Sequence, residues 1–205
     1  PSAAFRFAQT SPAREPSLSS VTAIEHFAFA GCSSLERLEH LDNLVSLGEG
    51  VFGYGSHYTG CISLKSIGDM PKLESMEQKC FMGCTALETV GDLSSLKEIP
   101  YEAFDGCTSL VSIGDLSNVT IIGSYGFNQC KKLTSIPNLG SLESVNQSAF
   151  SGCESLALLG NLRNLTSFGY LPFHNCPNLV LEVLPDSAAE QYAKDYNMQY
   201  TYITE

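Results

Sequence analysis

Cysteine spacing is the first feature of this 205-residue chain that suggests chemistry, because thiols form disulfides and hold zinc. One series of cysteines recurs every 23 residues from Cys61 onward, and its first step is 29 residues. The series comprises Cys32, Cys61, Cys84, Cys107, Cys130, Cys153 and Cys176. Side chains that recur in one register stack in parallel instead of pointing at each other, and a small thiol packs well in a core. We therefore predict a ladder of reduced, buried cysteines rather than disulfides or a metal site.

Cys80 lies outside this series, in a position that Ala28, Ala103 and Ala149 occupy elsewhere. With Cys84 it spells Cys-x-x-x-Cys, but no second pair or histidine completes a tetrahedral zinc site. We expect Cys80 to fill a small space in the core.

Acidic residues form a second periodic series. Asp69, Asp92 and Asp115 share one position, and Asn138 and Asn161 follow in the next two units. Gly-Asp and Gly-Asn pairs form turns in which the side chain accepts bonds from nearby backbone N–H groups. The alternative is a stripe of oxygen ligands for Ca²⁺, about 5 Å apart if the units stack as parallel strands do.

The catalytic motifs that were sought are missing. His26, His40, His57 and His174 are scattered, and the sequence contains no H-E-x-x-H, G-x-S-x-G or Walker pattern. A G-x-G-x-x-G match at residues 48–53 coincides with ordinary repeat positions, and no long helix follows it. The sequence therefore predicts no enzymatic activity and no cofactor.

A phenylalanine series runs in step with the cysteines and defines the repeat. It consists of Phe29, Phe52, Phe81, Phe104, Phe127, Phe150 and Phe173. The matched units start at Val21, Leu44, Leu73, Leu96, Val119, Leu142 and Leu165. The unit from Leu96 reads LKEIPYEAFDGCTSLVSIGDLSN. One unit cannot bury its apolar residues alone, but stacked copies share a continuous core, so the pattern predicts a solenoid of about seven coils.

The repeat also predicts which segments become regular structure. We expect one short parallel strand per coil, at residues 110–114 and their equivalents, and a single helical or 3₁₀ turn at the Ala-Phe pair on the opposite face. The expected organisation is an N-terminal linker or cap at residues 1–20, the solenoid at 21–185 and a C-terminal cap at 186–205. In that cap, Asp186 or Ser187 would start a helix over residues 188–196, Asn197 would end it, and a strand would follow at 200–203. Phe5 and Phe7 alternate as in a half-buried strand.

An insertion at residues 53–60, GYGSHYTG, is the one interruption of the period. Its Tyr54, His57 and Tyr58, between glycines, are a composition common in recognition loops. The alternative is a tolerated surface loop without a task.

The quoted units, with TSLVSIGDLSNVTIIGSYGFNQC among them, resemble the BspA-like class of bacterial leucine-rich repeats over roughly residues 18–185. The chain departs from that pattern in the insertion and at Pro137, which replaces the usual glycine. The resemblance implies an α/β solenoid, a right-handed leucine-rich-repeat superhelix of parallel strands with a C-terminal cap. It also implies an exported or cell-surface protein involved in adhesion and host contact, and a natural C-terminus near Glu205.

Composition limits the partners. The net charge of −11 disfavours nucleic acid and anionic lipid surfaces, and the chain has no apolar run that could insert into a membrane. The exposed strand positions are expected to form a broad, shallow face; its candidate binding residues are Lys65, Glu88, Val111 and Thr134. We predict a monomeric, non-catalytic interaction module for a protein or glycan on another cell or matrix. The alternative is a structural spacer with no ligand of its own.

Overall fold

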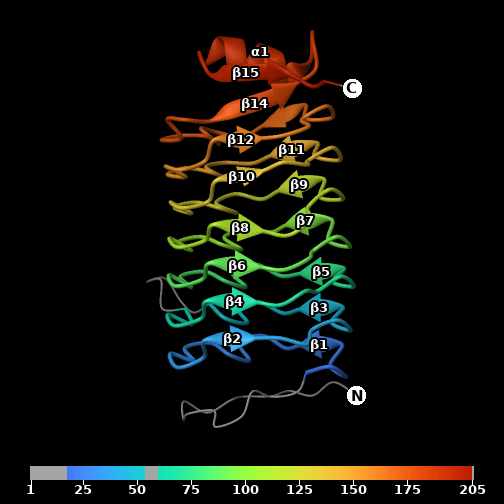
Figure 1. Ribbon diagram of the computed structural model, residues 1–205, viewed down its shortest axis with the longest axis vertical. Coiled ribbons are helices and arrows are strands. Elements are labelled where there is room, and N and C mark those ends of the chain that lie inside the picture. Colours follow the sequence, from blue (N-terminus) through green and yellow to red (C-terminus); the bar gives the residue numbers. More distant parts are fainter. Residues whose placement is uncertain (1–17, 54–59, 205) are drawn as a thin grey trace.

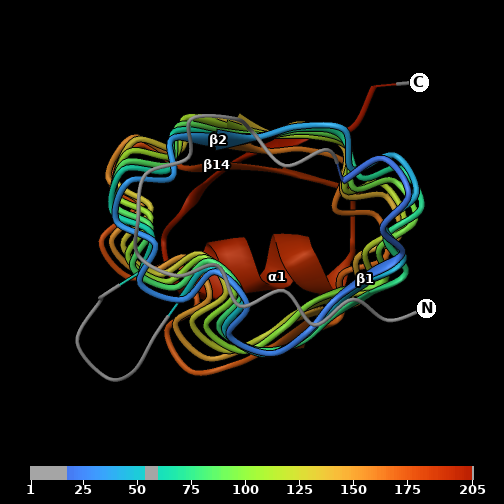
Figure 2. The same cartoon turned by 90° about the horizontal axis from the view of Figure 1, so that it is seen from below.

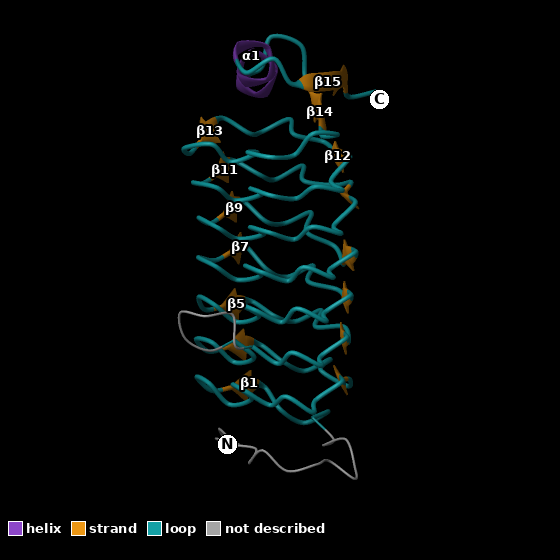
Figure 3. Cartoon of the chain, turned by 90° about the vertical axis from the view of Figure 1, so that its left-hand side faces the viewer, coloured by secondary structure: helices purple, strands orange, loops and turns teal. Residues whose placement is uncertain are grey.

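The computed structural model describes residues 18–53 and 60–204, in which the chain winds into a stack of coils with one repeat unit per coil (Figure 1). Viewed along the stack axis, each coil traces a flattened ring (Figure 2). The strands form two columns on different sides of that ring (Figure 3). Phe5 and Phe7, and most of the expected linker at 1–20, lie outside the described residues. Leu18 is buried, so packing begins before the predicted start of the solenoid at Val21.

Each coil contributes two strands, so the prediction of one strand per coil was wrong. The first column consists of two parallel sheets, β1-β3-β5 and β7-β9-β11-β13. Its strands are β1 (Ala23–Ile24), β3 (Ser46–Leu47), β5 (Ser75–Met76), β7 (Glu98–Ile99), β9 (Ile121–Ile122), β11 (Ser144–Val145) and β13 (Ser167–Phe168). Each strand occupies the first Leu-x-x-Ile segment of its unit. The segment points its last residue into the core and forms backbone bonds to the next coil.

The second column holds the strands that were predicted. It also consists of two parallel sheets, β2-β4-β6-β8 and β10-β12-β14-β15. Its strands are β2 (Arg37–Leu38), β4 (Ser66–Ile67), β6 (Thr89–Val90), β8 (Ser112–Ile113), β10 (Ser135–Ile136), β12 (Leu158–Leu159), β14 (Val180–Val183) and β15 (Gln199–Tyr202). Strand β8 lies inside the expected range 110–114. A Gly-Asp or Gly-Asn turn follows β4, β6, β8 and β12 and ends each of them after two residues.

The Ala-Phe segments form turns, not the expected helical or 3₁₀ turn. In every unit except the one with the insertion, two residues of this segment have left-handed backbones, for example Glu102 with φ of 53° and Gly106 with φ of 74°. Such residues interrupt a right-handed helix. Alternate N–H groups instead donate to carbonyls of the next coil: Glu102 to Ser124 at 3.0 Å, Phe104 to Gly126 at 2.8 Å and Gly106 to Asn128 at 2.9 Å. The turns therefore contribute a third set of backbone hydrogen bonds between coils, in addition to those of the two strand columns.

The phenylalanine series forms a continuous stack through the core. Neighbouring ring centroids are 5.0 to 5.9 Å apart, and the rings of Phe81, Phe104 and Phe127 lie within 3° of parallel. Leucines and isoleucines from both strand columns are buried around this stack. Each ring from Phe52 to Phe150 is covered on both sides by another phenylalanine, so the core repeats with the backbone.

Helix α1 (Ala188–Asp195) lies across the C-terminal end of the stack (Figures 1 and 2). Its N-cap is Ser187, whose hydroxyl accepts from the Glu190 N–H at 3.2 Å, as the sequence suggested. Ala189 and Ala193 are buried, and the Tyr192 ring stacks on Phe168 with centroids 4.1 Å apart. Strand β15 then pairs with β14 in parallel. This eight-residue helix is the only one among the described residues, and no described helix is long and apolar enough to span a membrane.

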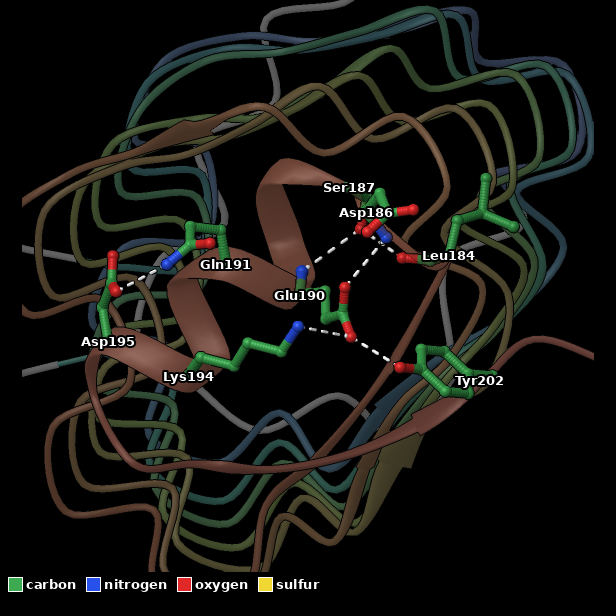
Figure 4. A network of polar contacts seen from close by, with 8 residues as sticks. All are labelled: Leu184, Asp186, Ser187, Glu190, Gln191, Lys194, Asp195 and Tyr202. Atoms are coloured by element: carbon green, nitrogen blue, oxygen red, sulfur yellow. Dashed lines mark hydrogen bonds and ion pairs between the residues drawn. The ribbon is translucent and has the colours of Figure 1, made fainter.

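A carboxylate fixes the helix to the last strand (Figure 4). Glu190 accepts from the Tyr202 hydroxyl at 2.6 Å, the Lys194 ammonium at 2.8 Å and the Asp186 N–H at 2.8 Å. Its side chain is only 3% exposed. The bonds from Lys194, then Tyr202, lower the pKa of Glu190 to about 2. The sequence does not reveal this network, because Tyr202 lies beyond the turn at Asn197 and only the fold brings its hydroxyl to Glu190.

Replacing one ring of the stack should destabilise the whole solenoid. We expect Phe104→Ala to lower the free energy of unfolding by about 3–5 kcal/mol, since it leaves a cavity between two rings that cannot move together. Ile62→Ala, at a half-exposed side chain, is the control and should cost far less. Denaturant unfolding followed by circular dichroism measures both; equal losses would contradict the importance of the stack.

Glu190 should make stability depend on acid. Its pKa of about 2 lies below the ordinary value of 4.5, so its contribution is complete above pH 4.5 and is lost as the pH falls towards 2. We expect Glu190→Gln to lower the melting temperature at pH 7 and to reduce its further fall between pH 4.5 and pH 2. Glu143→Gln, at an exposed side chain, makes the same charge change and should leave that acid dependence intact. Identical acid profiles for Glu190→Gln and the wild type would refute the assignment.

Candidate interaction surface

The four candidate binding residues of the strand face stand in one line along the second column. Lys65, Glu88, Val111 and Thr134 each precede a strand, and all four side chains are exposed. Each N–H in this line donates to the carbonyl one coil below, for example Glu88 to Lys65 at 2.8 Å and Val111 to Glu88 at 2.9 Å. The backbone beneath the line is therefore held in place. Their role in binding stays a prediction.

Charges on this face are few and partly paired. The Lys65 ammonium lies 2.9 Å from a Glu36 carboxylate oxygen, and its hydrogen bond holds the pKa of Glu36 below the ordinary value. Such exposed pairs contribute little to stability, so they remain available to an incoming partner. Further along, Val111 and Thr134 carry no charge, which leaves a mildly apolar surface towards the C-terminal coils.

The insertion residues Tyr54, His57 and Tyr58 lie outside the described residues. The residues on either side of the insertion are joined as they are in a unit without one. The Cys61 N–H donates to the Phe52 carbonyl at 2.9 Å, the same bond that Cys84 makes to Phe81 at 3.0 Å. The bond between the cysteine and the phenylalanine of the repeat is therefore the same in the unit with the insertion as in a unit without it.

The three aspartates accept hydrogen bonds from nearby backbone N–H groups. Asp92 accepts from the N–H and hydroxyl of Ser94 at 2.8 and 3.0 Å, and Asp115 accepts from Ser117 in the same way at 2.8 and 3.0 Å. Asp69 accepts instead from the N–H of Asp92 at 2.9 Å. In the part of the chain that the structure describes, no three His, Cys, Asp or Glu side chains gather as a metal site. Asp92 and Asp115 therefore form the expected turns, whereas Asp69 bonds to the backbone of the next coil, and the Ca²⁺ stripe stays a prediction.

The cysteine series forms a ladder with one cysteine per coil. From Cys61 onward each thiol donates to the carbonyl of a phenylalanine in an adjacent coil; the donors, acceptors and distances are Cys61 to Phe29 at 3.0 Å, Cys84 to Phe52 at 3.7 Å, Cys107 to Phe81 at 3.1 Å, Cys130 to Phe104 at 3.2 Å, Cys153 to Phe127 at 3.1 Å and Cys176 to Phe150 at 3.0 Å. The cysteine is thus a small donor as well as a small apolar group. Cys80 fills its alanine position and bonds to the carbonyls of Glu77 and Gly48 at 3.0 and 3.1 Å.

Burial makes most of these thiols poor nucleophiles. It raises the pKa of Cys61 to about 12 and holds those of Cys107 and Cys130 well above the ordinary value. The two ends of the ladder differ. Cys32 and Cys176 are partly exposed, so desolvation penalises their thiolates less than those of the interior cysteines.

Sequence reading missed a cleft at the C-terminal end. It has a volume of about 640 Å³ and lies between the last repeat turn, from Leu171 to Leu179, and the segment from Tyr192 to Gln199. Its walls combine Phe173 and two tyrosines with polar Asn175 and Asn197. The cleft arises where α1 replaces the next coil, and a repeat pattern gives no signal for such a junction.

Sequence reading also missed a line of aromatic residues next to the Ala-Phe turns. Phe27, Tyr101 and Tyr170 are 44%, 41% and 71% exposed, and Tyr125 is half-buried between the last two. All four occupy the two positions just before the Ala-Phe pair. The signal was available, because aromatic residues are rare at other exposed positions of the repeat.

Comparison with known proteins identifies the class. The model of the BspA type leucine rich repeat region matches residues 3–57 and 53–180, in six copies. The chain belongs to the family of BspA-type leucine-rich repeat proteins, and the resemblance seen in the sequence is confirmed. No curated protein matches the chain.

Solved structures share the fold. A leucine-rich repeat protein from Bacteroides ovatus is 27% identical over 91% of this chain, with a TM-score of 0.73. A leucine-rich repeat protein from T. pallidum is 26% identical over 90% of this chain and 81% of its own, with a TM-score of 0.71. A third, from Eubacterium ventriosum, is 23% identical over 77% of this chain and 41% of its own, with a TM-score of 0.66, and shows the fold alone. The chain spans less than half, 46%, of the B. ovatus protein.

The two ends of the cysteine ladder should react before its interior. With an aromatic disulfide reagent at pH 8, we expect Cys32 and Cys176 to be modified first, and the six buried thiols only on unfolding. Peptide mass mapping at successive times measures the order, and Cys32→Ser/Cys176→Ser should remove the fast phase. An intact mass that rises by two protons per bridge on reduction would show disulfides and overturn the ladder.

Proposed function

We propose that this chain is a non-catalytic interaction module, exported to the cell surface, that contacts a protein or glycan partner through the strand face of the second column. Membership of the leucine-rich repeat family supports an interaction or structural role. The more specific proposal rests on one observation. Exposed side chains, two charged and two uncharged, recur in a line at one-coil spacing over a backbone that bonds to the coils on both sides.

Preorganisation is what makes this line suitable for binding. A partner that contacts it does not have to order the backbone, so less of the contact energy is lost on association. The line is shallow and continuous, which suits an extended partner better than a small molecule. We further propose that the coils wind in the right-handed sense, as connections between parallel strands do in nearly all folds.

A charge-matched pair of variants tests the strand face. The strand-face variant is Lys65→Glu/Glu88→Lys/Thr134→Arg, and the control on the first column is Lys97→Glu/Glu74→Lys/Thr120→Arg. Both make identical charge changes, at positions that are exposed or half-exposed. Each protein is immobilised, exposed to matrix and cell-surface extracts, and any enriched protein or glycan is purified and its affinity measured.

We expect the wild type and the first-column control to retain the same purified partner. The strand-face variant should bind it at least about tenfold more weakly, because reversing these charges replaces attraction to the partner with repulsion. Equal binding by all three proteins would refute the strand face. Enrichment of no partner by the wild type would instead favour the spacer role.

A further inference from the structure

The residues just before each Ala-Phe pair form a continuous surface feature, which we call the turn ridge. It consists of the pairs His26–Phe27, Glu49–Gly50, Gln78–Lys79, Tyr101–Glu102, Ser124–Tyr125, Gln147–Ser148 and Tyr170–Leu171. Among the described residues five aromatic side chains are exposed, and three of them, Phe27, Tyr101 and Tyr170, lie on this ridge. The other two lie in the segment after the last coil. The turn ridge is therefore where the repeat presents its rings to solvent.

Backbone bonds between coils hold the turn ridge in place. Lys79 donates to the Tyr101 carbonyl at 3.0 Å, and Tyr125 donates to the Gln147 carbonyl at 2.9 Å. The Ser148 N–H donates to the Tyr170 carbonyl at 3.0 Å. These bonds repeat from coil to coil, so the ring positions follow the period of the solenoid. Tyr125 and Tyr170 are two coils apart, a separation of about 10 Å at the usual spacing of parallel strands.

Side-chain contacts orient two of the rings further. The Tyr101 and Tyr125 rings meet edge to face with centroids 6.0 Å apart, and the Lys79 ammonium lies 5.8 Å from the Tyr101 centroid. The Gln147 amide donates to the Tyr125 hydroxyl at 2.8 Å. A ring fixed in this way loses little conformational entropy when a ligand covers it.

The C-terminal half of the turn ridge carries no charge. From Ser124 to Leu171 its side chains are tyrosine, serine, glutamine and leucine. Hydroxyl and amide groups that both donate and accept hydrogen bonds surround exposed ring faces. A phosphate or sulfate would find no cation there, on a chain whose net charge is −11. The charge pattern therefore favours a neutral ligand rich in hydroxyl groups.

The turn ridge leads directly into the C-terminal cleft. Leu171 is the last residue of the ridge and also lines the cleft of about 640 Å³. There the Tyr192 and Tyr196 rings stack with centroids 4.4 Å apart, and Asn175 and Asn197 supply further amides. Ring faces and amides thus continue from the open ridge into a hollow large enough for a small ligand group.

We propose that the uncharged part of the turn ridge, from Ser124 to Leu171, together with the cleft, binds a neutral polysaccharide chain. The apolar C–H faces of its pyranose rings would stack on the tyrosines, and its hydroxyls would bond to serine and amide groups. The two-coil spacing of Tyr125 and Tyr170 is comparable to a disaccharide unit of an extended glycan. This inference deepens the proposed interaction function and rests on it, but it uses a different surface from the strand face.

The test uses defined probes on the whole chain. Cellohexaose, maltohexaose, xylohexaose, mannohexaose and chitohexaose are the neutral probes, and heparin and polygalacturonate are the polyanions. Binding is measured by saturation-transfer NMR and calorimetry. The variants are Tyr125→Ala/Tyr170→Ala, which removes two ring faces, and Tyr170→Phe, which keeps the face but not the hydroxyl. Thermal melts confirm folding, which Tyr170 should affect little because it is 71% exposed.

We expect at least one neutral hexasaccharide to bind the wild type, with saturation transferred to its ring C–H protons. Tyr125→Ala/Tyr170→Ala should weaken that binding at least about tenfold, and Tyr170→Phe by no more than about threefold. The strand-face variant Lys65→Glu/Glu88→Lys/Thr134→Arg should bind the sugar as the wild type does.

Three results would overturn the inference. They are no binding of any neutral probe, binding that survives Tyr125→Ala/Tyr170→Ala, and tighter binding of a polyanion than of every neutral probe. Any of these, with a protein partner still lost in the strand-face variant, would reject the turn ridge and leave the proposed function standing. Capture of a peptide on the ridge in place of sugar would also reject it.

Discussion

The distance between successive coils is the constraint on which the rest of this structure depends. Backbone bonds between parallel strands require about 4.8 Å. Parallel, offset phenylalanine rings pack at a similar centroid distance of about 4.5–7 Å, and here neighbouring centroids are 5.0 to 5.9 Å apart. The thiol of Cys107 reaches the Phe81 carbonyl across the same gap, at 3.1 Å. A side chain that needs more room than this distance leaves cannot be accommodated. At Gly114, for example, a Cβ atom would collide with the Gly91 carbonyl.

That single distance explains which parts of the fold could be predicted from the sequence. Burial recurs with the period, so the phenylalanine stack, the cysteine ladder and the second strand column all follow from residue type. Hydrogen bonding at the turn does not follow, because the left-handed residues include Lys79, Glu102 and Tyr125, which carry no signature of positive φ. The first strand column was missed for a related reason. Two Leu-x-x-Ile segments per unit were recognised, but their apolar spacing alone does not say that both bond to the next coil.

The candidate site was less predictable than the core because a repeat fixes only what it buries. Pattern reading gives weight to residues that recur, whereas recognition depends on residues that vary between copies. Lys65, Glu88 and Val111 could be placed on one face because their register was known. The turn ridge and the cleft do not follow from the repeat, because exposed rings occur in only some units and the cleft lies where the repeat stops. The cleft exists because α1 is narrower than the coil whose place it takes.

A solenoid keeps its surfaces energetically separate. Each coil contacts only its neighbours, so a ligand on the turn ridge and a partner on the strand face would be coupled only through the coils that both touch. Those coils are joined by phenylalanine stacking and by backbone bonds along both strand columns and the turns. Binding on the two surfaces should therefore be additive rather than cooperative. Variation at exposed positions can then change one surface without changing the other, because the core beneath is the same in every coil.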